Sequence, residues 1–180
     1  MTKQLTHIDE TGNASMVDVS NKQATVRTAV ASGKVVFPSD VFDTLASKDF
    51  LGHKGSIIQT AVIAGIQAVK KTAELIPLCH QLNLSKIQID IAPVKNALQI
   101  RCKVKCNEQT GVEMEALTGV SVSALTIYDM CKALSHDIKI SCPRKYLINH
   151  DTKLVFPKYE NVLLNANSEE DYKKALEKLA

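Results

Sequence analysis

Residues 111–132 read GVEMEALTGVSVSALTIYDMCK, a run of mostly small and apolar residues that is long enough for one helix. The run also contains four ionisable side chains, which are Glu113, Glu115, Asp129 and Lys132. Charged side chains are seldom placed in a tightly packed helix unless they are paired or take part in chemistry. The stretch therefore predicts a long packed helix whose charged residues have a function.

The stretches around this helix, which is predicted over residues 113–134, complete a pattern of strands and helices. A second helix is predicted from about Ser56 to Leu75, because apolar residues recur at steps of three and four, and Pro77 ends it. Extended or alternating patterns predict strands at residues 24–36, 87–91, 98–106 and 137–141. This order predicts a ferredoxin-like α+β fold, in which an antiparallel sheet carries both long helices on one face.

Two helix starts are predicted in more detail. Ser39 is expected to be the N-cap of a short helix that follows Phe37. Glu113 and Glu115 would point about 200° apart on a helix, but they would share a face in an extended chain. We therefore expect the long helix to begin near Glu115 or later. The simpler interpretation is that both acids stabilise a helix N-terminus.

Composition limits the classes of function that are open to the chain. The sequence has 180 residues, of which 45% are hydrophobic and 4% aromatic, so one domain with an aliphatic core is expected. The net charge is +3 and the lysines are scattered along the sequence, which does not favour nucleic-acid binding. There is no apolar run of about 20 residues and the first residues are polar, so neither a membrane span nor a signal peptide is expected.

The cysteines favour a reducing compartment. There are five, without a Cys-x-x-Cys pair, and a cytoplasmic location is therefore expected. Cys102 and Cys106 fall on the apolar side of a predicted strand, so we interpret them as core residues. A zinc site completed by Cys79 and His80 is the alternative, but the spacing fits no recognised ligand pattern.

Five residues are candidates on chemical grounds alone. Lys54 lies in a glycine-flanked loop before a predicted helix, where backbone N–H groups already favour anions, so it is either a phosphate ligand or a solvated lysine. His80 follows an apolar run and is either a structural histidine or an acid–base group; His53 is a weaker candidate. Asp129 and Lys132 are three residues apart and can form an ion pair.

Several motifs together resemble the molybdenum cofactor biosynthesis protein C family, the cyclic pyranopterin monophosphate synthases. The resemblance extends from about Thr6 to Ile140. Besides residues 111–132, it rests on four short stretches, which are Met16-Val-Asp-Val-Ser20, His53-Lys-Gly55, Ala64-Gly-Ile-Gln-Ala68 and Leu75-Ile-Pro-Leu-Cys-His80.

The resemblance implies a function and a site. The expected activity is conversion of (8S)-3′,8-cyclo-7,8-dihydroguanosine 5′-triphosphate to cyclic pyranopterin monophosphate with release of pyrophosphate. No cofactor is required by the sequence and no metal ligand is assigned, although Mg²⁺ is compatible with the substrate. The residues implied as catalytic are Lys54, His80, Asp129 and Lys132. The residues implied to bind substrate are Cys79, Glu113, Met114 and Glu115, with Lys153 as a further candidate.

The spacing of these residues indicates an oligomer. Glu115 and Asp129 are 14 residues apart, which is about 21 Å along a straight helix. One small pocket cannot easily contain both from the same chain. The family, correspondingly, forms a hexamer built from dimers, with its sites at subunit interfaces.

The C-terminal part departs from the family pattern. The family has a glycine-rich Ser-Gly-Gly-Lys-Ser-Gly motif after its last strand, whereas no glycine follows Gly119 here. Lys153 lies near the expected position of the motif's lysine. We therefore divide the chain into a synthase-like domain, residues 1–140, and an atypical extension, residues 141–180, that ends in a short helix. The alternative function is a catalytically impaired homologue that acts as an oligomeric nucleotide-binding or scaffold protein.

Overall fold

The computed structural model describes residues 7–9 and 11–147 of the chain. Lys153 and the predicted C-terminal helix lie outside the described residues. The division of the chain at residue 140 stays a prediction.

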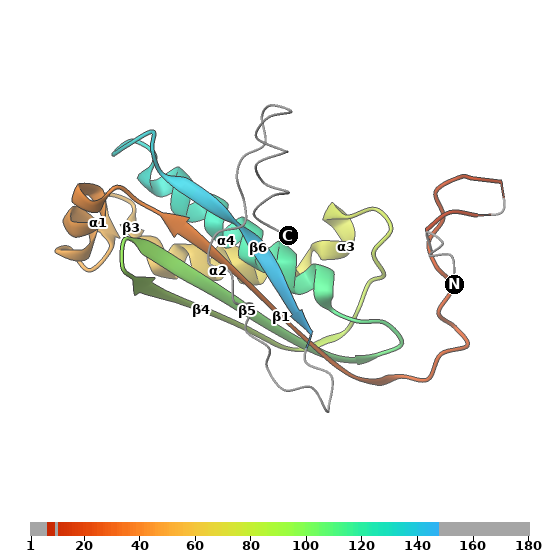
Figure 1. The fold of residues 1–180 in the computed structure, drawn as a ribbon. Coiled ribbons are helices and arrows are strands. Elements are labelled where there is room, and N and C mark those ends of the chain that lie inside the picture. Colours follow the sequence, from red (N-terminus) through yellow and green to blue (C-terminus); the bar gives the residue numbers. More distant parts are fainter. Residues whose placement is uncertain (1–6, 10, 148–180) are drawn as a thin grey trace, which may run out of the picture. The chain divides into compact units, whose positions relative to one another are not determined.

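The sheet has the expected topology. Its strands are β1 (Thr25–Val36), β4 (Leu84–Val94), β5 (Ala97–Glu108) and β6 (Lys139–Leu147). They lie side by side in the order β4-β5-β1-β6, and every neighbouring pair is antiparallel (Figure 1). This is the strand order of a ferredoxin-like sheet, because the first and third of the four strands lie at its centre. The predicted fold class is confirmed.

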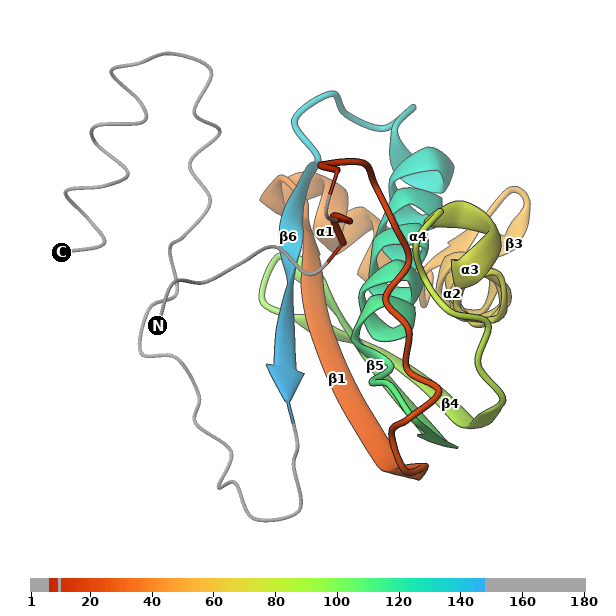
Figure 2. The same ribbon diagram turned by 90° about the vertical axis from the view of Figure 1, so that its right-hand side faces the viewer.

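Two long helices, α2 (Ile57–Lys70) and α4 (Glu113–Cys131), cover one face of this sheet (Figures 1 and 2). The shorter helices α1 (Ser39–Ala46) and α3 (Thr72–Leu75) lie at opposite ends of this helical layer (Figure 1). A small hairpin of β2 (Leu51–Gly52) and β3 (Gly55–Ser56) connects α1 to α2. Glu113 and Glu115 therefore lie at one end of α4 in this helical layer, and Asp129 and Lys132 lie at the other end. Within the described ranges, no helix is long and apolar enough to span a membrane.

The core between the sheet and the helices is mainly aliphatic, as predicted. The largest fully buried side chains include Leu98, Ile100, Ile127 and Ile57. Cys102 and Cys106 are also fully buried, on the face of β5 that carries Leu98 and Ile100. Their interpretation as core residues is confirmed.

The contact between α2 and α4 depends on small residues. Gly65 of α2 faces Gly119 and Ser123 of α4, and the Ser123 hydroxyl donates a hydrogen bond of 3.0 Å to the backbone carbonyl of Ala61. A Cβ atom at Gly65 would collide with the Ser123 hydroxyl and would lie 3.0 Å from the Gly119 carbonyl oxygen. Gly65 therefore allows the two helices to pack closely.

Helix boundaries differ from the predictions at several places, and α4 ends at Cys131 and not at Leu134. The long helix α4 begins at Glu113, not near Glu115, so both acids lie in its first turn, where the helix dipole favours them. The predicted helix over residues 56–75 is divided at Lys71, whose φ of −108° is not helical. The N-cap of α1 is Pro38 and no side chain caps it, so the N-cap prediction for Ser39 is wrong.

Basic side chains gather on the face of the sheet away from the helices. On β5, Arg101, Lys103 and Lys105 alternate with buried apolar residues, and Lys105 is paired with Lys86 of β4. Residues paired in this way project from the same face of a sheet. Lysines that are scattered along the sequence are therefore neighbours in the fold. The expectation that the chain does not bind nucleic acid stays a prediction.

Candidate active site

Lys54, Asp129 and Lys132 come together at the C-terminal end of α4. The Lys132 ammonium donates a hydrogen bond of 2.6 Å to the Asp129 carboxylate, which confirms the predicted pair. This hydrogen bond, and then the charge of Lys132, lowers the pKa of Asp129, and the charge of Lys54 lowers it further. In return, the Asp129 carboxylate raises the pKa of Lys132. At neutral pH, Asp129 is therefore a carboxylate and Lys132 a cation.

The hairpin before α2 determines the position of Lys54. Gly52 pairs with Gly55, whose φ of +102° is strained for any residue with a side chain. The next residue, Ser56, accepts a hydrogen bond of 3.3 Å from the backbone N–H of Gln59 and so caps α2. Lys54 therefore lies just before a helix N-terminus, where its charge and the helix dipole both favour an anion.

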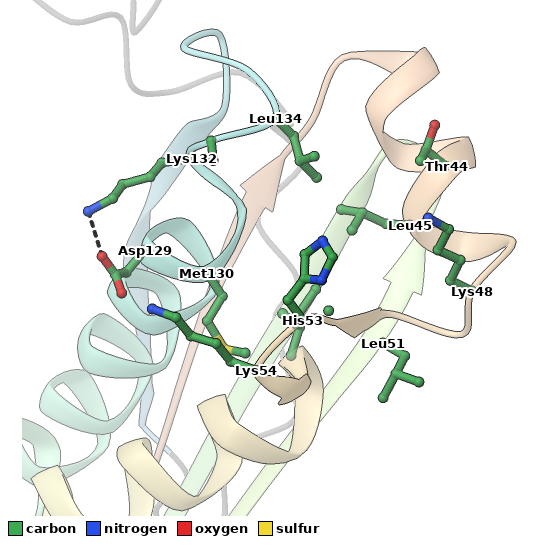
Figure 3. A pocket seen from close by; sticks show the side chains of 13 residues that line it. Thr44, Leu45, Lys48, Leu51, His53, Lys54, Asp129, Met130, Lys132 and Leu134 are labelled. Atoms are coloured by element: carbon green, nitrogen blue, oxygen red, sulfur yellow. Dashed lines mark hydrogen bonds and ion pairs between the residues drawn. The ribbon is translucent and has the colours of Figure 1, made fainter.

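A pocket of about 580 Å³ opens between α1, the β2–β3 hairpin and the end of α4 (Figure 3). We call it the lysine pocket. Its polar wall includes Lys54, Asp129 and Lys132, and its apolar lining includes Leu45 and Met130. This volume lies within the usual range for small-molecule sites, roughly 300–1,000 Å³. The pocket combines an apolar surface with cations, which suits an organic molecule that carries phosphate groups.

A second group of predicted residues lies at the other end of α4. We call Cys79, His80, Glu113 and Glu115 the Cys79–Glu115 cluster. Glu115 is only 4% exposed, and its burial raises the pKa of its carboxyl group, an effect to which the negative charge of Glu113 adds. Burial also raises the pKa of the Cys79 thiol, and the Glu115 charge raises it further. Glu115 is therefore suited to carry a proton, and Cys79 remains a thiol at neutral pH.

The N-terminal segment determines the orientation of His80. The Nε2 atom of His80 lies 2.8 Å from the backbone carbonyl oxygen of Val17. Because a carbonyl oxygen only accepts hydrogen bonds, Nε2 must carry a proton, and Nδ1 is the ring nitrogen that is left to bind a further proton. Asp18, which follows Val17 in the sequence, also lies near His80. Hydrogen bonds from Ser20 lower the pKa of the Asp18 carboxyl group most, and the charge of His80 lowers it further.

The structure thus places the predicted residues in two groups and not in one. Lys54, Asp129 and Lys132 lie at one end of α4, and the Cys79–Glu115 cluster lies at the other. Met114, in the first turn of α4, is 40% exposed. Glu115 and Asp129 remain about 21 Å apart along the helix axis, so a single pocket of one chain does not contain both groups.

Other residues at these sites were not predicted as functional. Lys48 and Thr44 of the α1 region line the lysine pocket, as does the weaker candidate His53. Lys48 follows a short helix in an ordinary polar sequence, and nothing in its spacing indicates a site. Asp18 belongs to a motif that supported the family resemblance, but only the fold places it near His80.

The described residues do not form a metal-binding site. In the described part of the chain, no group of three or more His, Cys, Asp and Glu side chains is arranged to hold a metal ion. The alternative of a zinc site is disfavoured, because Cys102 and Cys106 are in the core. The expectations about cofactors stay predictions.

The fold and these two groups define an α+β protein of ferredoxin-like topology with a cationic small-molecule pocket. The model of the MoaC family matches residues 16–146, and the chain belongs to this family.

Curated relatives agree with this assignment. A cyclic pyranopterin monophosphate synthase of Xanthomonas campestris pv. campestris strain B100 is 53% identical over 146 residues, which is 80% of this chain and 87% of the relative. The enzyme of the same name from Chloroflexus aggregans is 51% identical over 139 residues, which is 76% of this chain and 83% of the relative.

Proposed function

We propose that the chain is a cyclic pyranopterin monophosphate synthase of molybdenum cofactor biosynthesis. The reaction converts (8S)-3′,8-cyclo-7,8-dihydroguanosine 5′-triphosphate to cyclic pyranopterin monophosphate and releases pyrophosphate. Family membership and the shared name of the relatives support this activity. The structural observation that carries the proposal is the lysine pocket, in which Lys54 and the Asp129–Lys132 pair line one cavity of suitable size.

The protonation states favour defined roles for these residues. Lys54 and Lys132 are cations that can bind the triphosphate and stabilise the negative charge at its reacting phosphate. Asp129 is a carboxylate whose position beside Lys132 allows it to accept a proton. His80 can accept a proton at Nδ1, and Glu115 can donate one because its pKa is raised. The rearrangement needs such proton transfers when rings open and close.

The separation of the two groups supports a site that is shared between subunits. We propose a homo-oligomer, a dimer-based hexamer as in the family, in which one copy supplies the lysine pocket and another supplies the Cys79–Glu115 cluster. A surface of α4 between the two groups is suited to such a contact. Met114 and Leu125 are 40% and 57% exposed, and helical spacing places them on one line with Lys132. Two copies of α4 packed antiparallel along this line would bring opposite ends together.

A cytoplasmic location is part of the proposal. Four of the five cysteines, namely Cys79, Cys102, Cys106 and Cys131, are free thiols. Free thiols persist in a reducing compartment, and a substrate made from GTP would be available there.

Pyrophosphate release from the cyclised GTP substrate tests the proposal. The wild-type protein should release pyrophosphate, with and without added Mg²⁺ as separate arms. Lys132→Ala should reduce kcat by at least about 100-fold, because it removes a cation and the partner of a proton carrier. Lys86→Ala, which removes an exposed lysine of β4, is the matched control and should retain activity.

The same assay distinguishes the second candidate function. The chain has no glycine after Gly119, so the family's glycine-rich lysine motif is absent, which favours an impaired homologue. Tight binding of the substrate without release of pyrophosphate under any of these conditions would support a nucleotide-binding or scaffold role and would contradict the proposed activity.

A further inference from the structure

The lysine pocket has a second polar wall, which the family-derived residues do not account for. Lys48 and Thr44 belong to the α1 region, and His53 belongs to the β2–β3 hairpin. Figure 3 shows Lys48 and Thr44 on the α1 side of the pocket, across from the Asp129–Lys132 pair. The ring of His53 lies between these two sides in the same view. The cavity is thus bounded by basic side chains on both sides.

The charges of the lining residues do not cancel. Among the lining residues that the structure describes, Asp129 is the one acid, and its carboxylate is bound to Lys132. The side chain of Lys48 has neither a hydrogen-bond nor an ion-pair partner in the part of the chain that the structure describes. Thr44 is less suited to bind an anion, because its hydroxyl already donates a hydrogen bond of 2.8 Å to the Asp40 carbonyl. Lys48 is therefore the unpaired cation on the α1 side.

The reaction gives this charge a defined use. A cyclic monophosphate forms when a hydroxyl oxygen of the substrate bonds to the α-phosphorus and the bond from this phosphorus to the bridging oxygen breaks. The bridging oxygen leaves with its electron pair as part of pyrophosphate, and the attacking hydroxyl loses its proton. Asp129 can take such a proton, so the α-phosphorus belongs near Asp129 and Lys132. The two outer phosphates then extend away from this pair.

We infer that Lys48 is a further substrate-binding residue, which holds the two outer phosphates that leave as pyrophosphate, with His53 beside it as a hydrogen-bond donor. This inference rests on the proposed function. The lysine pocket then has two parts, a reacting part at Asp129 and Lys132 and a pyrophosphate part at Lys48. Lys54, at the N-terminus of α2, lies on the side of the reacting part.

Calorimetric titration with inorganic pyrophosphate tests the inference on the full-length protein. Lys48→Ala should weaken binding of pyrophosphate about tenfold, as expected for one lost charge-assisted contact. Lys48→Arg keeps the charge and should stay within about threefold of wild type. Lys86→Ala removes an equally exposed charge from the outer face of the sheet and should bind like wild type. In turnover assays, Lys48→Ala should raise KM for the substrate more than it lowers kcat.

The outcomes separate this inference from the proposed function. Pyrophosphate that binds Lys48→Ala as tightly as wild type, or that does not bind wild type at all, overturns the inference even if the enzyme is active. An equal loss in Lys48→Ala and Lys86→Ala also overturns it, because only net charge would then matter. A protein that binds pyrophosphate through Lys48 but never turns over the substrate supports the phosphate site and contradicts the proposed activity.

Discussion

At the scale of single residues, burial and neighbouring charges determine which groups carry protons. Glu115 is buried near Glu113 and Cys79, and its pKa is raised. Asp129 is exposed and bound to Lys132, and its pKa is lowered. The pKa values of two carboxyl groups on one helix are therefore shifted in opposite directions. In the proposed oligomer, such a pair would supply both an acid and a base.

The raised pKa of Glu115 predicts a pH-dependent cost to stability. The ordinary value is 4.5, and the folded value lies above it. As pH rises through this interval, the unfolded chain loses its proton first, so the free energy of unfolding falls. Glu115→Gln should remove this loss. Below about pH 4, the free energy of unfolding of the variant should equal that of wild type. Toward neutral pH, the variant should become increasingly more stable than wild type.

Urea unfolding at a series of pH values measures this difference. Glu74→Gln, at an exposed position of α3, is the control and should show no comparable trend, since its interaction with Lys71 is a solvated contact of 3.9 Å. A stability difference between Glu115→Gln and wild type that stays constant from acidic to neutral pH would be inconsistent with a buried, proton-retaining carboxyl group.

Residue positions differed in how well the sequence could predict them. The Asp129–Lys132 pair could be predicted from helical spacing. The position of Lys54 just before the N-terminus of α2 could be predicted from the glycines that flank it. The proton position on His80 did not follow, because its partner is a carbonyl of Val17, far away in the sequence. Lys48 was not predicted either, since its neighbours in the pocket come from α4 and the hairpin.

At the scale of elements, the close contact between α2 and α4 holds these two helices against each other. Gly65→Ala tests this contact. Helix propensity alone would make the variant more stable by about 1 kcal/mol. However, the new methyl group would meet the Ser123 hydroxyl and the Gly119 carbonyl, and overpacking of this kind costs about 1–3 kcal/mol. We expect a net loss of stability.

Thermal and urea unfolding of the purified variant give the sign directly. Gln67→Ala, at an exposed position of the same helix, is the control and should be neutral or slightly stabilising. If Gly65→Ala were more stable than wild type, propensity would outweigh packing, and the contact between the helices would be looser than described.

Elements with strong periodicity were predictable, and their ends were less so. The alternation on β4 and β5 predicted both strands because one face of the sheet is buried. The division of the helix at Lys71 was not predicted, because it depends on local hydrogen bonds. One of them is the 3.0 Å hydrogen bond that the Thr72 hydroxyl donates to the Val69 carbonyl. The start of α4 at Glu113 was predicted wrongly, because the prediction assumed that the two acids share a face in an extended chain. The helix dipole instead favours both acids in the first turn of the helix.

At the scale of the whole molecule, the length of α4 separates the lysine pocket from the Cys79–Glu115 cluster. The sequence could indicate this separation, because the number of residues between Glu115 and Asp129 determines a length on any helix. It could not indicate the lysine pocket or the basic face of the sheet, because both are assembled from segments that only the fold brings together. The central claim is that the pocket and the cluster of different subunits together form one site.

Activity of mixed oligomers tests this claim most directly. Lys132→Ala damages the lysine pocket and Glu115→Gln damages the Cys79–Glu115 cluster, so each variant alone should be nearly inactive. When the two are co-expressed, a mixed dimer contains one site with both defects and one site with neither. Random pairing should therefore restore about a quarter of wild-type pyrophosphate release. Activity no greater than that of the separate variants would contradict a shared site.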